Sequence, residues 1–116
     1  IRRTAALRLA YYNSSDGLQE LLDILDEEKF HERVGAACAL CALGNQVGID
    51  YIHGLLRSNA DLSKLERTNL VGSLPQLLTH VGVEWYQSGA EPEVAVRLIL
   101  DKALEWIESV APFQKQ

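Results

Sequence analysis

The residues best suited to chemistry are the only two cysteines, Cys38 and Cys41, which stand in the run VGAACALCALGN over 34–45. A thiol pair at C-x-x-C spacing forms a redox site when its first cysteine starts a helix, and half a zinc site when further ligands lie nearby. A third interpretation is that both side chains are small hydrophobes inside a helix. The three histidines do not stand at a spacing typical of zinc ligands: His31, His53 and His80.

Helical periodicity places Cys38 in the middle of a helix, where the helix N-terminus does not lower its pKa. We therefore expect both thiols to be buried, with a zinc or redox site as the alternative. The chain contains no G-x-S-x-G, phosphate-binding glycine loop or H-E-x-x-H motif. We expect a non-enzyme without metal or cofactor.

Composition sets limits on the class of protein. The 116 residues suit a single domain spanning 1–116, with 47% hydrophobic and 23% charged residues and a net charge of −5. This charge argues against a nucleic-acid partner, and no apolar run is long enough for a membrane span. Two cysteines without a disulfide pattern favour a reducing, cytoplasmic compartment. The chain starts at Ile1 and has no Met, so we expect a fragment of a longer protein.

The apolar residues recur at helical spacing and predict an all-α fold. We expect helices over about 1–12, within 17–43 and 46–80, and over about 92–110. The pairs Asp16/Gln19 and Ser63/Glu66 resemble helix-starting caps, and Gly44-Asn45 predicts a helix end. Pro75 predicts a kink or a split of its helix. Three aromatic residues are expected to seal the end of the core, with an exposed binding hot spot as the alternative: Trp85, Tyr86 and Trp106.

The chain also repeats itself. A shift of 31 residues places RRTAALRLAYYN over RVGAACALCALG, and a shift of 34 places Arg33 on Arg67 and Leu40 on Leu74. The stretch LQELLDILDEEKFHERVGAACALCALGN, followed by VGIDYIHGLLRS, resembles the HEAT and armadillo superfamily of helical repeats. The resemblance is good over 1–58, weak over 59–80 and absent over 81–116. It implies a right-handed α-α superhelix, with the last helix as a C-terminal cap.

In that superfamily, the second helix of each pair lines a concave surface that often holds the partner. The resemblance therefore implies a partner-binding surface made of the following residues: Thr4, Arg8 and Tyr11, then Gly35, Ala39 and Ala42, then Asn69, Ser73 and Gln76. It favours a scaffold or adaptor that binds a peptide or helix of a protein partner. The alternative is a regulatory helical domain within a larger enzyme or signalling ATPase.

An acidic patch is predicted on a different helix. Its four residues are spaced by 4, 3 and 4 positions and would share one helix face: Asp16, Glu20, Asp23 and Glu27. Such a patch is either an ordinary solvated face or a site that attracts a basic segment of the partner.

Overall fold

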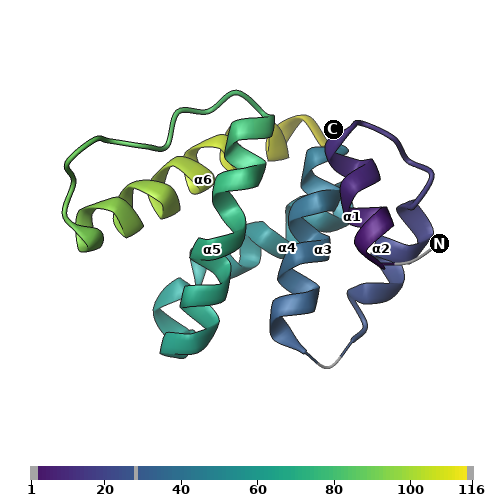
Figure 1. Cartoon of the computed structure of the whole chain (residues 1–116), viewed down its shortest axis with the longest axis horizontal. Helices are drawn as coiled ribbons and strands as arrows, with labels where there is room; N and C mark the ends of the chain where they lie inside the picture. Colours follow the sequence, from purple (N-terminus) through teal and green to yellow (C-terminus); the bar gives the residue numbers. More distant parts are fainter. Residues whose placement is uncertain (1–2, 28, 115–116) are drawn as a thin grey trace.

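The computed structural model describes residues 3–27 and 29–114, and the side chains of residues 5–27 and 29–110. Within these residues the chain forms six α-helices, a short 3-10 helix and no strand, which confirms the predicted all-α fold (Figure 1). The helices are α1 (Arg3–Tyr11), α2 (Leu18–Ile24), α3 (Phe30–Ala42), α4 (Gln46–Arg57), η1 (Asn59–Asp61), α5 (Lys64–His80) and α6 (Pro92–Gln114).

The central element is α3, which packs against α1, α2, α4 and α5. The helices α1, α3 and α5 follow one another side by side, and α6 packs against both α4 and α5 (Figure 1). The described residues of α4 and α5 make no extended contact with each other, because α6 lies against both. The result is a compact globule of 39 × 31 × 26 Å.

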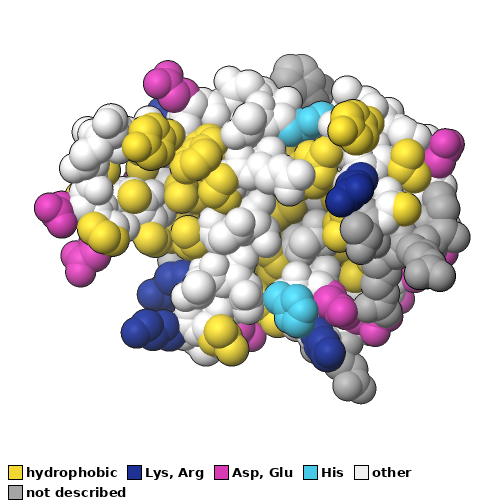
Figure 2. Space-filling model, in the orientation of Figure 1, with side chains coloured by type: hydrophobic (Ala, Val, Ile, Leu, Met, Phe, Trp, Pro, Cys, Tyr) yellow, Lys and Arg dark blue, Asp and Glu magenta, His cyan; other side chains and the backbone are white. Residues whose placement is uncertain are grey.

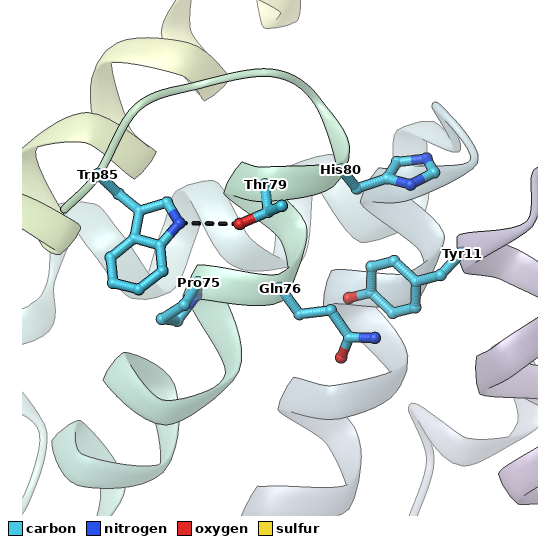
Figure 3. A pocket seen from close by; sticks show the side chains of 6 residues that line it. All are labelled: Tyr11, Pro75, Gln76, Thr79, His80 and Trp85. Atoms are coloured by element: carbon cyan, nitrogen blue, oxygen red, sulfur yellow. Dashed lines mark hydrogen bonds between the residues drawn. The ribbon is translucent and has the colours of Figure 1, made fainter.

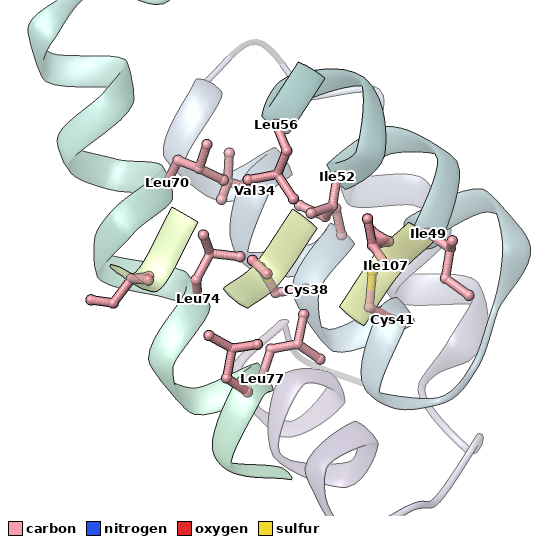
Figure 4. Packing of buried hydrophobic residues seen from close by; sticks show 14 residues of the cluster. Val34, Cys38, Cys41, Ile49, Ile52, Leu56, Leu70, Leu74, Leu77 and Ile107 are labelled. Atoms are coloured by element: carbon pink, nitrogen blue, oxygen red, sulfur yellow. The ribbon is translucent and has the colours of Figure 1, made fainter. Parts of the chain in front are cut away.

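Buried side chains form two clusters that α3 joins. Val34, Cys38 and Cys41 of α3 pack with leucines and isoleucines of α4, α5 and α6 (Figure 4). On its other side, Ala36 and Ala39 pack against α1 and α2. Small side chains on several faces of α3 therefore let four helices approach it, as the sequence predicts.

Two glycines allow especially close helix packing. A Cβ at Gly17 would lie 2.7 Å from Ala6, and one at Gly48 would lie 2.4 Å from the Cβ of Leu40. Neither position has room for a side chain. These glycines set how closely α2 approaches α1 and how closely α4 approaches α3.

The helices α1, α3 and α5 end in the same way. Each is followed by a residue with positive φ, which is Asn13 at 63°, Gly44 at 75° and Gly82 at 79°. The next residue donates its N–H to a carbonyl five positions back, as in Asn45 to Leu40 at 2.9 Å. This is the Schellman arrangement, and it confirms the helix end predicted at Gly44-Asn45.

Of the two predicted cap pairs, one is present. Ser63 Oγ accepts from the N–H of Glu66 at 3.1 Å, and the Glu66 carboxylate accepts from the N–H of Ser63 at 3.0 Å. The Asp16/Gln19 cap is wrong, because α2 begins after Gly17 without a side-chain cap. The tight fit of Gly17 against α1 determines that start instead.

Two predicted helix boundaries also differ from the structure. The first helix within the expected range 17–43 is only Leu18–Ile24, and the turn after it is closed by the N–H of Glu27 donating to the carbonyl of Ile24. Acidic residues at 23, 26, 27 and 28 oppose the negative end of the helix dipole and disfavour a longer helix. Pro75 does not split its helix, since α5 is continuous from Lys64 to His80.

Candidate functional site

A hollow of about 300 Å³ lies where α1, α3 and α5 run side by side. The N-terminal helix contributes an exposed cation, Arg8, and a half-buried aromatic ring, Tyr11. The other two helices contribute mainly small or polar residues. The lining is Leu7, Arg8, Tyr11, Gly35, Cys38, Gly72, Ser73 and Gln76.

A second hollow of about 440 Å³ shares Tyr11 and Gln76 with the first (Figure 3). Its far wall is the indole of Trp85, which donates its N–H to the Thr79 hydroxyl at 2.9 Å. Its near wall is the ring of Tyr11, which meets the ring of His80 edge to face at 5.6 Å. A flat apolar pocket between two aromatic walls suits a large apolar side chain of a ligand.

We call the surface formed by these two hollows the α1–α3–α5 face. Hydrophobic and uncharged side chains cover its middle part over α5 (Figure 2). The basic side chains that line the two hollows are Arg8 and His80, and there is no carboxylate among the lining residues. His80 is held by the turn after α1, because its Nε2 lies 3.0 Å from Oδ1 of Asn13.

Two helical glycines lie open on this face. A Cβ at Gly35 or at Gly72 would meet no atom within 4 Å, in contrast to Gly17 and Gly48. Packing therefore does not require a glycine at either position. Both residues line the first hollow, so the missing side chains leave its floor uncovered.

The structure brings together most of the predicted partner-binding residues. Arg8, Tyr11, Gly35, Ser73 and Gln76 line one hollow. Their clustering follows from the side-by-side packing of the three helices that carry them.

The other predicted members of this surface do not line the hollows. Asn69 is half-buried one turn before Ser73, and its carbonyl accepts from the Ser73 hydroxyl at 3.0 Å. Ala39 is a correction, because it is fully buried and packs toward α1 and α2. Ala42 packs against the main core cluster. Thr4 lies in α1, but its side chain falls outside the described residues.

Several lining residues were not predicted as part of this site. The sequence indicates Pro75 only as a helix breaker, Trp85 as an aromatic that seals the core or forms an exposed hot spot, and His80 as a zinc-ligand candidate. Trp85 reaches the site because the chain turns at Gly82 after α5, which periodicity within a helix does not reveal. The remaining ones are Leu7, Cys38, Gly72 and Thr79.

A larger hollow of about 840 Å³ lies on the other side of α5, against the start of α6. Lys64 and Arg67 line its cationic side, and Val71, Pro92 and Val96 line its apolar part. Gly72 borders this hollow as well as the α1–α3–α5 face. The exposed backbone of α5 at Gly72 therefore separates the larger hollow from the α1–α3–α5 face, and no side chain stands between them at this position.

The acidic patch is only partly on a helix. Glu20 and Asp23 belong to α2, whereas Asp16 precedes it and Glu27 follows it. Asp23 accepts from the amide of Gln19 at 2.9 Å, and the Glu27 carbonyl accepts from the guanidinium of Arg33 at 2.7 Å. None of the four acidic residues lines the hollows described above.

The predicted burial of both thiols is confirmed, with 1% exposure for Cys38 and 2% for Cys41. Desolvation raises the pKa of Cys38 to about 12, and it also raises the pKa of Cys41. Such thiols are poor nucleophiles and poor metal ligands, since both roles need the thiolate. The residues that the structure describes contain no group of three or more metal-ligating side chains suited to an ion.

No family model, curated protein or solved structure gives a significant match to this chain. Among the described residues, no helix is long and apolar enough to cross a membrane. The assignment of function therefore depends on the geometry of the α1–α3–α5 face and on the pattern of residues in the sequence.

Proposed function

We propose that this chain is a non-catalytic protein-interaction module that binds a peptide or helix of a protein partner on its α1–α3–α5 face. The observation that carries the proposal is the open floor at Gly35 and Gly72 between side chains that suit binding. Arg8 and Tyr11 stand beside this floor, and the aromatic pocket of Trp85 adjoins it.

The physical argument concerns the cost of these glycines. Glycine inside a helix destabilises it by about 0.5–1 kcal/mol relative to alanine. At Gly35 and Gly72 no packing contact offsets this cost, since a methyl group would meet only open space. Glycine lets the backbone of a ligand approach a helix closely. The two glycines therefore suit a surface on which a partner segment binds.

We also propose that α1, α3 and α5 are the second helices of HEAT-like pairs. Their shared Schellman ends and their side-by-side packing support this, as does the 31-residue shift from Asn13 to Gly44. The α3 and α5 helices start 34 residues apart and end 38 apart, so α5 is one turn longer. The pairing is irregular at α4, which packs on α6 rather than on α5.

The test fills the floor without disturbing the fold. Gly35→Leu and Gly72→Leu place a good helix former where the Cβ has room, so thermal stability is kept or raised. The side chain then occupies the hollow. Gly54→Leu is the matched control, because Gly54 is also open and helical but lies on α4, away from this face.

The experiment is affinity capture from cells with the intact parent protein, followed by mass spectrometry. A partner that binds the α1–α3–α5 face is retained by wild type and Gly54→Leu and is lost with Gly35→Leu, Gly72→Leu and Tyr11→Ala. Capture that is equal for all five proteins would refute the proposed function.

A further inference from the structure

We propose that the partner segment is acidic and that it crosses α5 at Gly72, with carboxylates near Arg8 on one side and near Lys64 and Arg67 on the other. This inference rests on the proposed function and specifies the chemistry of its ligand. It replaces the expected attraction between a basic partner and the acidic patch, because none of that patch's residues lines either hollow.

The first argument is charge. The whole chain carries a net charge of −5, yet the surface on both sides of Gly72 has three cations. Arg8 and Lys64 are exposed, and neither forms an ion pair with a residue that the structure describes. One carboxylate, Glu93, lines the larger hollow beside Lys64 and Arg67.

The second argument is the state of Arg67. Its Nη2 donates to the carbonyl of Asn59 at 3.0 Å, which fixes the guanidinium at the edge of the larger hollow. Its Nε is buried and has no hydrogen-bond partner among the described residues. This buried Nε is out of reach of a ligand, but a guanidinium that lines an apolar hollow still favours a carboxylate ligand, because charge-assisted hydrogen bonds are the strongest available to it.

The third argument is shape. The two hollows lie on opposite sides of α5, and both include Gly72, where a Cβ would meet no atom within 4 Å. A bound segment that reaches both hollows passes over α5 most closely at this point. Apolar side chains of the segment then enter beside Val71 and Val96 on one side and beside Tyr11 on the other.

The test is selection of binders from a phage-displayed library of random dodecapeptides, followed by affinity measurements with the selected peptides. We expect peptides rich in Asp and Glu with at least one large apolar residue. Their affinity should fall as NaCl is raised from 50 to 500 mM, because exposed charge pairs are screened.

Two charge variants then locate the site. Lys64→Glu places an acidic residue in the first turn of α5, where the helix dipole favours it, so a weaker affinity cannot come from unfolding. Arg8→Gln removes the charge on α1. We expect each to weaken binding about two- to fivefold, which is typical of an exposed charge pair. The matched controls, Lys29→Glu and Arg57→Gln, alter cations that line neither hollow and should leave the affinity unchanged.

The outcomes separate this inference from the proposed function. Neutral or basic peptides that lose affinity with Gly72→Leu but not with Lys64→Glu would overturn the acidic ligand and leave the binding face standing. Peptides that respond to none of these variants, or a failure to enrich any peptide, would count against both.

Discussion

Glycine serves two opposite purposes in this molecule. At Gly17 and Gly48, a neighbouring helix leaves no room for a side chain. At Gly35, Gly54 and Gly72, a Cβ would meet only open space. The first kind strengthens the fold by allowing close packing, and the second kind weakens it through the loss of helix propensity.

This difference predicts opposite effects on stability. Gly35→Ala and Gly72→Ala should each raise the free energy of unfolding by about 0.5–1 kcal/mol. Gly48→Ala should lower it by about 1–3 kcal/mol, because its Cβ would overlap the Cβ of Leu40 and the carbonyl of Ala37. Urea denaturation followed by circular dichroism measures all three. A loss of stability with Gly35→Ala would show that its side of the face is packed rather than open.

The buried thiols make stability depend on alkaline pH. In the folded chain the pKa of Cys38 is about 12, whereas an unfolded cysteine has a pKa of about 8.5. Between these values the unfolded chain releases a proton that the folded chain keeps. Stability is therefore full below pH 8 and decreases as the pH rises, by up to about 1.4 kcal/mol per pH unit for this thiol.

We predict that the urea midpoint falls steadily from pH 8 to pH 10.5 and that Cys38→Ala makes the decline shallower. In the same range, the native thiols should react slowly with Ellman's reagent and rapidly once urea unfolds the chain. Fast labelling of the native protein at pH 8 would contradict the burial of both sulfur atoms.

At the scale of the helix, local signals were predictable and tertiary ones were not. The capping box at Ser63 and Glu66 uses contacts within four residues, and the sequence pattern identifies it correctly. The start of α2 depends instead on how Gly17 fits against Ala6, a contact that no local pattern contains. Pro75 remains inside one helix because α5 packs against both α3 and α6.

The same reasoning explains how much of the candidate site could be predicted. Arg8, Tyr11, Ser73 and Gln76 share helix faces with a repeating spacing, so the sequence pattern predicts that they lie together, and they line one hollow. Trp85 enters from the segment after α5, so only the folded chain shows its place in the site.

The capping box itself provides a test of α5. Ser63→Ala removes the side-chain acceptor for the N–H of Glu66 and should cost about 0.5–2 kcal/mol of unfolding free energy. Ser15→Ala, in the loop before α2, is the matched control and should change stability by less than about 0.5 kcal/mol. Equal urea midpoints for the two variants would show that the N-terminus of α5 contributes little to the fold.

At the scale of the whole molecule, α6 packs against both α4 and α5, which make no extended contact with each other. Ile99, Ala103 and Ile107 are buried against α4 and α5, and Trp106 packs at the edge of the same cluster. Because α5 carries half of the proposed binding face, the position of that face depends on α6. The residues of α3 belong to both clusters, so loosening one cluster should destabilise the other.

We therefore predict that Ile107→Ala lowers the stability of the entire chain by about 2–5 kcal/mol, the usual cost of truncating a fully buried isoleucine. Glu108→Gln is its neighbour and control. It weakens only the exposed contacts of Glu108 with His53, at 3.2 Å, and with Arg57, at 3.0 Å, and should cost less than about 1 kcal/mol.

Tryptophan fluorescence reports on Trp85 and Trp106, whereas far-ultraviolet circular dichroism reports on all helices. If α3 couples both clusters, the two signals lose their native values at the same urea concentration in Ile107→Ala. Separate transitions, with part of the helical signal surviving after the fluorescence change, would show that α1–α3 fold independently of α6.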